Sequence, residues 1–391
     1  MSNIKRIITF AFVILSFVAC TADRFQGSGW STPLVDEGNV YVATIDGELI
    51  SVNIDSGSEN WRAVSLDDDD RRFVAKAIYS KPFIYDNKTF IGTSAGKILG
   101  FNKQTGLDEV SLQDIEEKVL LSEENYGPMI VGNIVSNEDL IYVPASNGEL
   151  LIFKYNELEM FDPVCSYQAE EAIWNTPVYD ELNQQIIFGS MDGKMYSINN
   201  QCNLNWEFDT KSSIVGSPIL ENSQIYFGTL NRKFYSINAQ KGTITWKFDD
   251  SKGWFWAAPV INSDIVYAPN LDGGVYALNK KTGQIKWKYE TKSPIVSSPV
   301  VIDDFLIFVT KNGELLVIHK DSKRKLGTCN IDKKIYSSIE VHENKIFIQV
   351  SDGSLRGFNI KKNGNPDELW QKPFFTREND DRNDEDWDPS C

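Results

Sequence analysis

Short runs of β-branched and aromatic residues recur along the chain, for example at 40–42, 225–227 and 265–267. A compact turn sequence follows most of these runs: Asp46-Gly47, Asn147-Gly148, Asp192-Gly193, Asp272-Gly273, Asn312-Gly313 and Asp352-Gly353. Asp-Gly and Asn-Gly between alternating runs are typical of two-residue type I′ hairpins. The pattern therefore predicts antiparallel hairpins. Ala95-Gly96 and Asn231-Arg232 occupy the remaining two places, and Arg232 predicts a strained turn or one of another type.

A second signal, small residues followed by proline, gives this pattern a period. It occurs at Pro33, Pro82, Pro128, Pro177, Pro218, Pro259 and Pro299, with Ile339 in the eighth place, at intervals of 49, 46, 49, 41, 41, 40 and 40 residues. The preceding residue is small in seven repeats (Thr32, Gly127, Thr176, Ser217, Ala258, Ser298 and Ser338) and suits a crowded innermost strand. Lys81 is the exception, and we expect it to point into a channel.

Four short strands at this period are typical of a propeller blade, and blades bury their faces only by stacking around an axis. The sequence therefore predicts an all-β fold, an eight-bladed β-propeller of four-stranded antiparallel blades. We expect it to span residues 31–375.

A tryptophan motif points to a family. The run Ala277-Leu-Asn-Lys-Lys-Thr-Gly-Gln-Ile-Lys-Trp287 resembles the tryptophan-docking motif of PQQ-repeat propellers, and 51–61 and 236–246 are similar to it. The resemblance covers essentially the whole mature chain and implies that Trp61, Trp206, Trp246, Trp287 and Trp370 dock blade on blade. Blades two, three and seven lack this tryptophan, with Val110, a place near Phe161, and Gly327 instead.

The N-terminus carries an export signal. Lys5 and Arg6 precede an apolar run at 7–18, which is too short for a membrane span. It ends in Leu-Ser-Phe-Val-Ala-Cys, which resembles a bacterial lipobox with Phe17 where leucine is preferred. We predict a lipoprotein signal peptide at 1–19, lipidation of Cys20 and a short linker at 20–30. Ordinary secretion and a retained anchor are the alternatives, and a strand from 24–29 added to the last blade stays open.

Charge and residue content narrow the partners and the chemistry. The formal net charge is −16, which argues against nucleic acid and against anionic lipid headgroups, so we expect membrane contact through the lipid anchor only. Two histidines build neither a Ser-His-Asp arrangement nor most metal sites, so no catalytic residue and no metal ligand is assigned. The run Asp67 to Asp70 lacks the spacing of a calcium loop.

Four cysteines follow the signal: Cys165, Cys202, Cys329 and Cys391. Export permits disulfides, and four thiols allow three full pairings, between which the sequence does not choose. From 376 to 391 the chain is polar and acidic, and we predict a disordered tail.

One constellation suggests a binding site. Trp30, Tyr79, Trp174, Trp256 and Tyr336 stand three residues before the repeat marker, so a closed propeller places them on one ring, with Trp254 beside it. Such a ring is suited to a peptide, a glycan or a flat molecule. The alternative interpretation is inter-blade packing, because large aromatic residues in sheets usually lie in the core.

Three functions stay open. The chain is similar to BamB-type outer-membrane assembly lipoproteins, which implies a non-catalytic scaffold for envelope proteins at the outer membrane, in the periplasm or at the cell surface. A sensor that binds a glycan or small molecule in the aromatic ring is the second. The chain also looks like quinoprotein dehydrogenases, but it has no adjacent cysteines and few insertions. We therefore expect neither PQQ nor Ca²⁺, and we expect a monomer.

Overall fold

The computed structural model describes residues 31–44, 47–63, 78–110, 128–155 and 161–374. Within these ranges the chain forms strands and turns, and no helix is long and apolar enough to cross a membrane. The predicted signal peptide, Cys20, the linker with Trp30, the acidic run at 67–70, Cys391 and the acidic tail lie outside the described residues.

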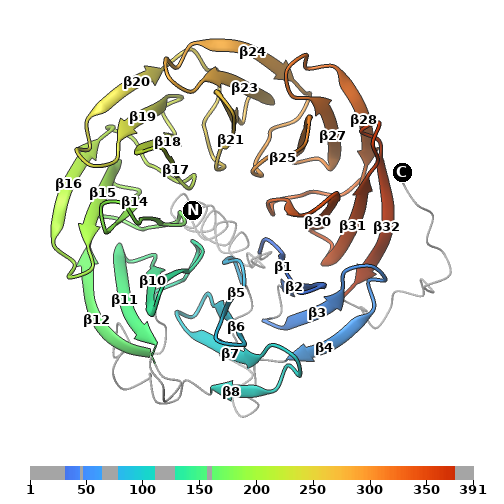
Figure 1. Ribbon diagram of the computed structural model, residues 1–391, viewed down its shortest axis with the longest axis horizontal. Coiled ribbons are helices and arrows are strands. Elements are labelled where there is room, and N and C mark those ends of the chain that lie inside the picture. The colour runs from blue at the N-terminus through green and yellow to red at the C-terminus, as the bar shows by residue number, and fades with distance from the viewer. Residues whose placement is uncertain (1–30, 45–46, 64–77, 111–127, 156–160, 375–391) are drawn as a thin grey trace, which may run out of the picture.

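The predicted fold is confirmed: eight four-stranded antiparallel sheets surround one axis (Figure 1). In chain order, blades 1 to 4 are β1 (Leu34–Asp36), β2 (Asn39–Ala43), β3 (Leu49–Asn53), β4 (Glu59–Ala63); β5 (Phe83–Tyr85), β6 (Lys88–Gly92), β7 (Ile98–Asn102), β8 (Asp108–Val110); β9 (Val135–Asn137), β10 (Leu140–Pro144), β11 (Glu149–Tyr155), β12 (Phe161–Gln168); β13 (Val178–Asp180), β14 (Gln185–Gly189), β15 (Lys194–Asn199), β16 (Leu204–Asp209).

Blades 5 to 8 are β17 (Ile219–Glu221), β18 (Gln224–Gly228), β19 (Phe234–Asn238), β20 (Ile244–Phe248); β21 (Val260–Asn262), β22 (Ile265–Pro269), β23 (Gly274–Asn279), β24 (Ile285–Glu290); β25 (Val300–Ile302), β26 (Phe305–Val309), β27 (Glu314–His319), β28 (Lys325–Asn330); β29 (Glu340–His342), β30 (Lys345–Gln349), β31 (Ser354–Ile360), β32 (Pro366–Pro373). The first strand of each blade has three residues and lies nearest the axis (Figure 1).

The repeat marker of blade 3 was predicted at the wrong residue. Strand β13 starts directly after Pro177, and β9 starts directly after Ile134. The marker place in blade 3 is therefore Ile134, not Pro128, and the residue before it is Asn133, not Gly127. Six prolines and two isoleucines keep the period, because β-branched isoleucine favours the extended backbone that leads into a strand, and both isoleucines are buried there at 5% exposure.

The turns between the second and third strands also differ from the prediction. In blade 4 the N–H of Ser190 donates to the carbonyl of Lys194, and the N–H of Gly193 donates to the carbonyl of Ser190. Only Gly193 has a positive φ, so this is a three-residue loop, a type I turn closed by a left-handed glycine. Arg232 adopts the same left-handed conformation in blade 5, with φ 67°.

The core lies between blades rather than inside one. Ile187 and Met195 of blade 4 share a cluster with Phe227 and Tyr235 of blade 5. Each such side chain contributes about 1.5–3 kcal/mol when it is withdrawn from water. Since both faces of every sheet are covered by neighbours, the ring must close before the apolar surface is fully buried.

Docked tryptophans join the outer strand of one blade to the last turn of the next. The indole N–H of Trp246 donates to the carbonyl of Lys280 in the next blade at 2.9 Å. The ring lies against Gly283, where a Cβ atom would approach it to 2.4 Å. Trp61, Trp206 and Trp370 repeat both contacts, with the carbonyls of Lys103, Ala239 and Ile54 and with Gly106, Gly242 and Gly57.

Two further joints depart from this motif. Trp287 packs against Tyr267, and it is the Tyr267 hydroxyl that donates to the carbonyl of Lys320 in blade 7. Lys323, with φ 50°, stands where the turns that meet Trp61, Trp206, Trp246 and Trp370 have glycine. At the next joint Gly327 replaces the tryptophan, and the turn of blade 8 approaches so closely that a Cβ on Gly327 would lie 2.4 Å from the Gly364 carbonyl.

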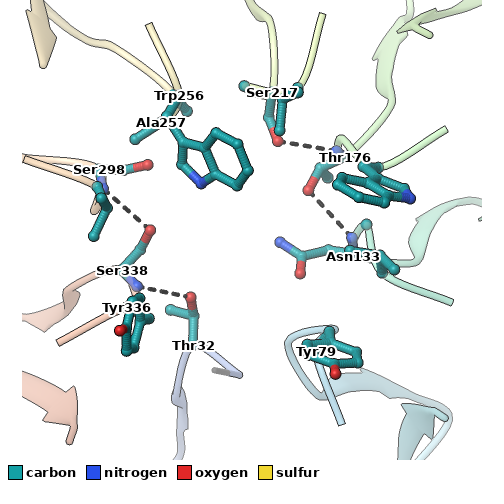
Figure 2. A pocket seen from close by; sticks show the side chains of 17 residues that line it. Thr32, Tyr79, Asn133, Thr176, Ser217, Trp256, Ala257, Ser298, Tyr336 and Ser338 are labelled. Atoms are coloured by element: carbon teal, nitrogen blue, oxygen red, sulfur yellow. Dashed lines mark hydrogen bonds between the residues drawn. The ribbon is translucent and has the colours of Figure 1, made fainter. Parts of the chain in front are cut away.

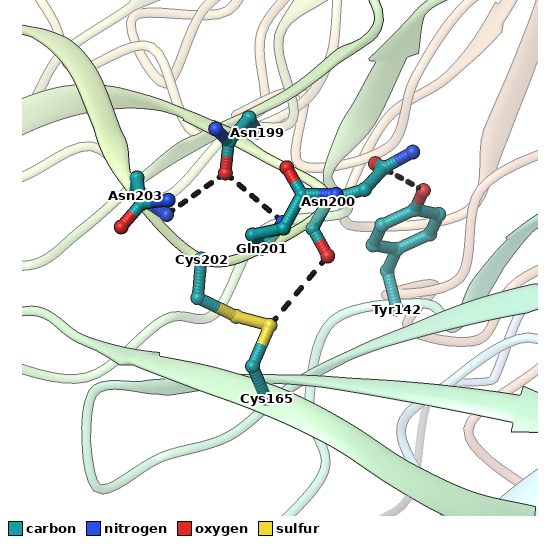
Figure 3. Close-up of a disulfide and its surroundings, with 7 residues drawn as sticks. All are labelled: Tyr142, Cys165, Asn199, Asn200, Gln201, Cys202 and Asn203. Carbon is teal, nitrogen blue, oxygen red and sulfur yellow. Dashed lines mark hydrogen bonds between the residues drawn. A yellow bond between two sulfur atoms is a disulfide. The ribbon is translucent and has the colours of Figure 1, made fainter.

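A disulfide replaces the docked tryptophan between blades 3 and 4. Cys165 lies opposite Ile152 on the neighbouring strand, just as Trp206 lies opposite Ser197 in blade 4. Cys165 therefore occupies the tryptophan place of blade 3, and the predicted site near Phe161 is wrong. Cys165 is bonded to Cys202, whose φ of 59° marks the place of the turn glycine (Figure 3). Its sulfur also lies 3.7 Å from the Asn200 carbonyl oxygen, which corresponds to the carbonyl that accepts from tryptophan elsewhere.

The remaining cysteine of the described sheets also forms a disulfide. Cys329, buried in β28, is disulfide-bonded, and its partner lies outside the described residues.

The ring closes by contacts between blades 8 and 1, each of which comes from one end of the chain. Trp370 donates to the Ile54 carbonyl at 3.1 Å, and the Gln349 amide donates to the Ala43 carbonyl at 2.9 Å. Val40 and Val42 share a core cluster with Phe347. Residues 24–29, left open as an added strand, lie outside the described residues.

The contact between tryptophan and glycine can be isolated by a pair of glycine substitutions. Gly283 and Gly38 both have positive φ, but a Cβ on Gly38 would meet nothing within 4 Å. We expect Gly38→Ala to lower the free energy of unfolding by about 1–2 kcal/mol through backbone strain. Gly283→Ala should cost a further ~1–3 kcal/mol, because it displaces Trp246. Urea unfolding of both variants measures the difference, and equal losses would show that the docking contact adds nothing.

The disulfide can be tested against the motif that it replaces. We expect the double variant Cys165→Ser, Cys202→Ser to lose about 2–4 kcal/mol of unfolding free energy. The double variant Cys165→Trp, Cys202→Gly restores the residue types of the other joints and should lose less. Both are compared with the oxidised parent by urea unfolding. A serine pair as stable as the parent would contradict a structural role for this bond.

Candidate binding site at the propeller axis

A pocket with a volume of about 130 Å³ opens at the axis, on the face where the chain enters each innermost strand. Its wall is built from equivalent residues of successive blades. The third residue before the marker lines it in every blade from 2 to 8: Tyr79, Val131, Trp174, Val215, Trp256, Val296 and Tyr336. Trp30 holds this place in blade 1, outside the described residues.

Large and small side chains alternate around this ring. Tyr79, Trp174, Trp256 and Tyr336 belong to blades 2, 4, 6 and 8, and valine occupies blades 3, 5 and 7. Neighbouring strand starts are crowded at the axis, so an aromatic ring on one blade needs a small side chain beside it. The result is a collar of four aromatic side chains, one from each of blades 2, 4, 6 and 8.

Inter-blade packing was the alternative interpretation of the aromatic ring. In the structure, the residue that precedes each ring residue of blades 2 to 8 in the sequence packs between the blades instead. Phe255, next to Trp256, is 1% exposed and contacts Phe234 and Tyr276 across the blade joint. In blades 2 to 5, 7 and 8 this place is isoleucine and is buried: Ile78, Ile130, Ile173, Ile214, Ile295 and Ile335. The aromatic collar is therefore separate from the core.

Two of the six predicted ring residues are not part of the described collar. Trp254 is 49% exposed and does not line the pocket. Trp30 lies outside the described residues. Val131 and Asn133 line the pocket but were missed, because Pro128 was taken as the marker of blade 3. Counting back about 41 residues from Pro177 would have led to the region of Ile134.

Below the collar, side-chain oxygens link the blades. The residue before the marker accepts a hydrogen bond from the backbone N–H of its counterpart in the preceding blade (Figure 2). Thr176 N–H donates to Ser217 Oγ at 2.9 Å, and four other joints have the same bond: Lys81 to Asn133, Asn133 to Thr176, Ser298 to Ser338, and Ser338 to Thr32. The small residues predicted here are mostly hydroxyl residues because the oxygen satisfies an edge N–H.

Lys81, the exception in this row, reaches across blade 1. Its ammonium lies 2.6 Å from Glu340 Oε2 in blade 8, and the N–H of Val35 in blade 1 donates to Glu340 Oε1 at 3.2 Å. The pair joins blades 8, 1 and 2 beside the channel. Its opposite charges are compensated within the wall, so it leaves no net charge at the pocket.

The pocket itself is uncharged and offers hydrogen-bond donors. None of its lining residues is Asp, Glu, Lys, Arg or His, and burial raises the pKa of Tyr79, which keeps its hydroxyl protonated. Figure 2 shows the Trp256 indole and the Asn133 amide reaching toward the middle of the opening from different blades. Asn133 Oδ1 already accepts from Lys81, whereas no acceptor in the described part of the chain is bonded to its Nδ2 or to Trp256 Nε1.

These residues do not fit the cofactors of propeller dehydrogenases. PQQ is a polyanionic quinone whose carboxylates need cationic partners, and Ca²⁺ needs several oxygen ligands, usually carboxylates among them. The pocket lining has neither a cationic side chain nor a carboxylate. In the described part of the chain no cluster of three or more His, Cys, Asp or Glu residues could hold a metal ion.

Comparison with known proteins gives the family. The family described as outer membrane protein assembly factor BamB matches residues 22–178 and 168–326 of this chain. The chain belongs to this family. The match covers blades from both halves of the ring, in agreement with the PQQ-type repeat read from the sequence.

Individual relatives of this BamB-family chain are distant. An uncharacterized protein of Rickettsia conorii is 30% identical over 169 residues, which are 41% of this chain and 38% of that protein, so the chain matches about two fifths of its length. The crystal structure of BamB from Moraxella catarrhalis has a TM-score of 0.68 at 16% identity and covers 85% of this chain and 94% of that one. A quinohemoprotein alcohol dehydrogenase from Comamonas testosteroni has a TM-score of 0.68 at 11% identity. The match covers 85% of this chain and 71% of that one. At these identities the two structures show only that this chain has the same fold as they do.

The row of side-chain oxygens predicts a stabilising substitution. Ala258 interrupts it, and the N–H of Ser217 has no acceptor in the described structure. We expect Ala258→Ser to supply that acceptor and to raise the free energy of unfolding by about 0.5–1.5 kcal/mol. Ala258→Val, which adds bulk at the same place without a hydroxyl, is the control and should not stabilise. Urea unfolding measures both, and no gain for Ala258→Ser would contradict this role of the hydroxyl row.

Proposed function

We propose that this protein is an exported, lipid-anchored scaffold that binds protein partners in the cell envelope and performs no catalysis. The observation that carries the proposal is membership of the family of an outer membrane assembly factor, over residues 22–326. An assembly factor works by holding other proteins, and a rigid ring with many loops is suited to that task.

The chemistry of the axis supports the non-catalytic part. In propeller dehydrogenases the cofactor sits over the axis, and here the corresponding lining has no charged side chain. A neutral pocket of about 130 Å³ is also small beside the ~300–1,000 Å³ typical of sites for drug-sized molecules. Metal and quinone chemistry both need charged groups that this lining lacks.

The path of the chain suggests which face meets the membrane. Thr32 lines the axial pocket, so the N-terminal segment joins the propeller beside the collar. Eleven residues, 21–31, separate Thr32 from Cys20, and they span at most about 36–40 Å when fully extended. A lipid on Cys20 would therefore hold the collar face close to the membrane surface.

The same face receives the longest connections of the chain. Residues 64–77 join β4 to β5, and residues 111–127 lead from β8 toward β9. All of these outer strands end, and the inner strands begin, on the collar face. We propose that a partner in the envelope contacts the propeller there.

Site-specific photo-crosslinking tests the proposal in membranes. A photoreactive residue in place of Trp254, exposed on the collar face, should give a crosslink to a defined envelope protein. The same residue in place of Leu182, which is 78% exposed in a turn on the opposite face, is the matched control and should give none. Cys20→Ala should release the protein from membranes and weaken the crosslink, because the lipid confines the protein near its partner.

Two results would contradict the scaffold. One is the absence of any crosslink from either face in intact, lipid-anchored protein. The other is reduction of a redox dye by the purified protein with an alcohol, when it is supplied with PQQ and Ca²⁺.

A further inference from the structure

The collar combines aromatic surface with donors and lacks charge, and this combination selects a ligand. We propose that the axial pocket binds a neutral sugar that carries an acetamido group, as a single ring or as the end of a short chain. The site does not depend on the protein partner, and its occupation is a separate property of the propeller.

Shape gives the first argument. The pocket has a volume of about 130 Å³ and opens to solvent, so it can receive the acetamido group and one edge of a sugar ring at a chain end, but it cannot enclose a large cofactor. Tyr79, Trp174, Trp256 and Tyr336 surround it, and flat aromatic faces are good platforms for the C–H faces of a sugar ring.

Hydrogen bonding gives the second argument. Asn133 Nδ2 and Trp256 Nε1 point toward the opening and have no acceptor in the described structure (Figure 2). The hydroxyls of Ser217 and Ser338 accept backbone N–H groups, which leaves their own hydrogens to donate. A pocket rich in donors selects a ligand rich in acceptors, and an acetamido carbonyl beside sugar hydroxyls is such a ligand.

Apolar walls fit the rest of the acetamido group. Val131, Val215 and Val296 stand between the aromatic residues of the collar. A methyl group packs well against valine and aromatic surface, while a free amine in its place would lose its hydration there.

Charge excludes the main competitors. Aromatic cages also bind quaternary ammonium ions, but the ammonium of Lys311 already lies 5.4 Å from the centre of the Tyr336 ring and would repel a cation. An anion finds no cationic side chain in the lining, and the protein carries a net charge of −16. A neutral ligand meets neither penalty.

The test uses two sugars that differ only in acetylation. Full-length, lipid-anchored protein in detergent is titrated with triacetylchitotriose and with its deacetylated, cationic form chitotriose, and binding is followed by isothermal calorimetry and tryptophan fluorescence. We expect saturable binding of the acetylated sugar and at least about tenfold weaker binding of the deacetylated one, because the unpaired donors lose their acceptor.

Collar variants locate the site. Trp256→Ala should weaken binding of triacetylchitotriose by about tenfold or more, whereas Trp254→Ala, an exposed tryptophan of the same loop outside the lining, should change it less than about twofold. Asn133→Asp keeps the acceptor for Lys81 but removes the donor and adds a negative charge, so it should shift preference toward chitotriose. A circular dichroism melt confirms that each variant is folded.

Three outcomes overturn the proposal. The first is no saturable binding of triacetylchitotriose by folded parent protein. The second is equal loss in the Trp254 and Trp256 variants, which would place binding outside the collar. The third is tighter binding of chitotriose or of tetramethylammonium by the parent, which would make the collar a cation site.

Discussion

The closed ring depends on contact between the outer strand of one blade and the last turn of the next. At four joints an indole N–H donates to a turn carbonyl while the ring covers a left-handed glycine. Both halves are required together, because any Cβ at that glycine would occupy the space of the ring. This contact fixes the angle between neighbouring sheets, and with it the position of every inner strand at the axis.

The joints that lack the motif show which part of the contact matters. The disulfide between Cys165 and Cys202 joins the same two backbone positions, and its sulfur still lies against the equivalent carbonyl. At Gly327 the roles are reversed, and the missing side chain lets the next turn approach directly. The joints with a docked tryptophan, the disulfide and Gly327 all keep close approach of strand and turn, and the chemistry that achieves it varies.

In the loop that leads into each of blades 2 to 8, successive residues make different contacts. One residue, isoleucine or Phe255, fills the core between blades. The next faces the axial pocket and alternates between aromatic and valine, and a residue just before the marker bonds to the preceding blade. The aromatic collar is therefore separate from the inter-blade core, because the same backbone presents one side chain to the core and its neighbour to the pocket.

The sequence alone determined the eight-fold repeat, the strand order within blades and the family resemblance, because each rests on local alternation and on turn residues. It also placed Tyr79, Trp174, Trp256 and Tyr336 on one ring, since equivalent positions in a closed repeat share a radius. The prediction of the repeat marker was wrong in blade 3. Pro128 was taken as the marker, so Asn133 was not recognised as a residue of the pocket. Only the tertiary structure decided that Cys165 pairs with Cys202, that Lys81 reaches Glu340, and that Trp254 stays outside the pocket. These depend on contacts between different blades, whose spacing is set by how the sheets pack around the axis and not by any stretch of chain.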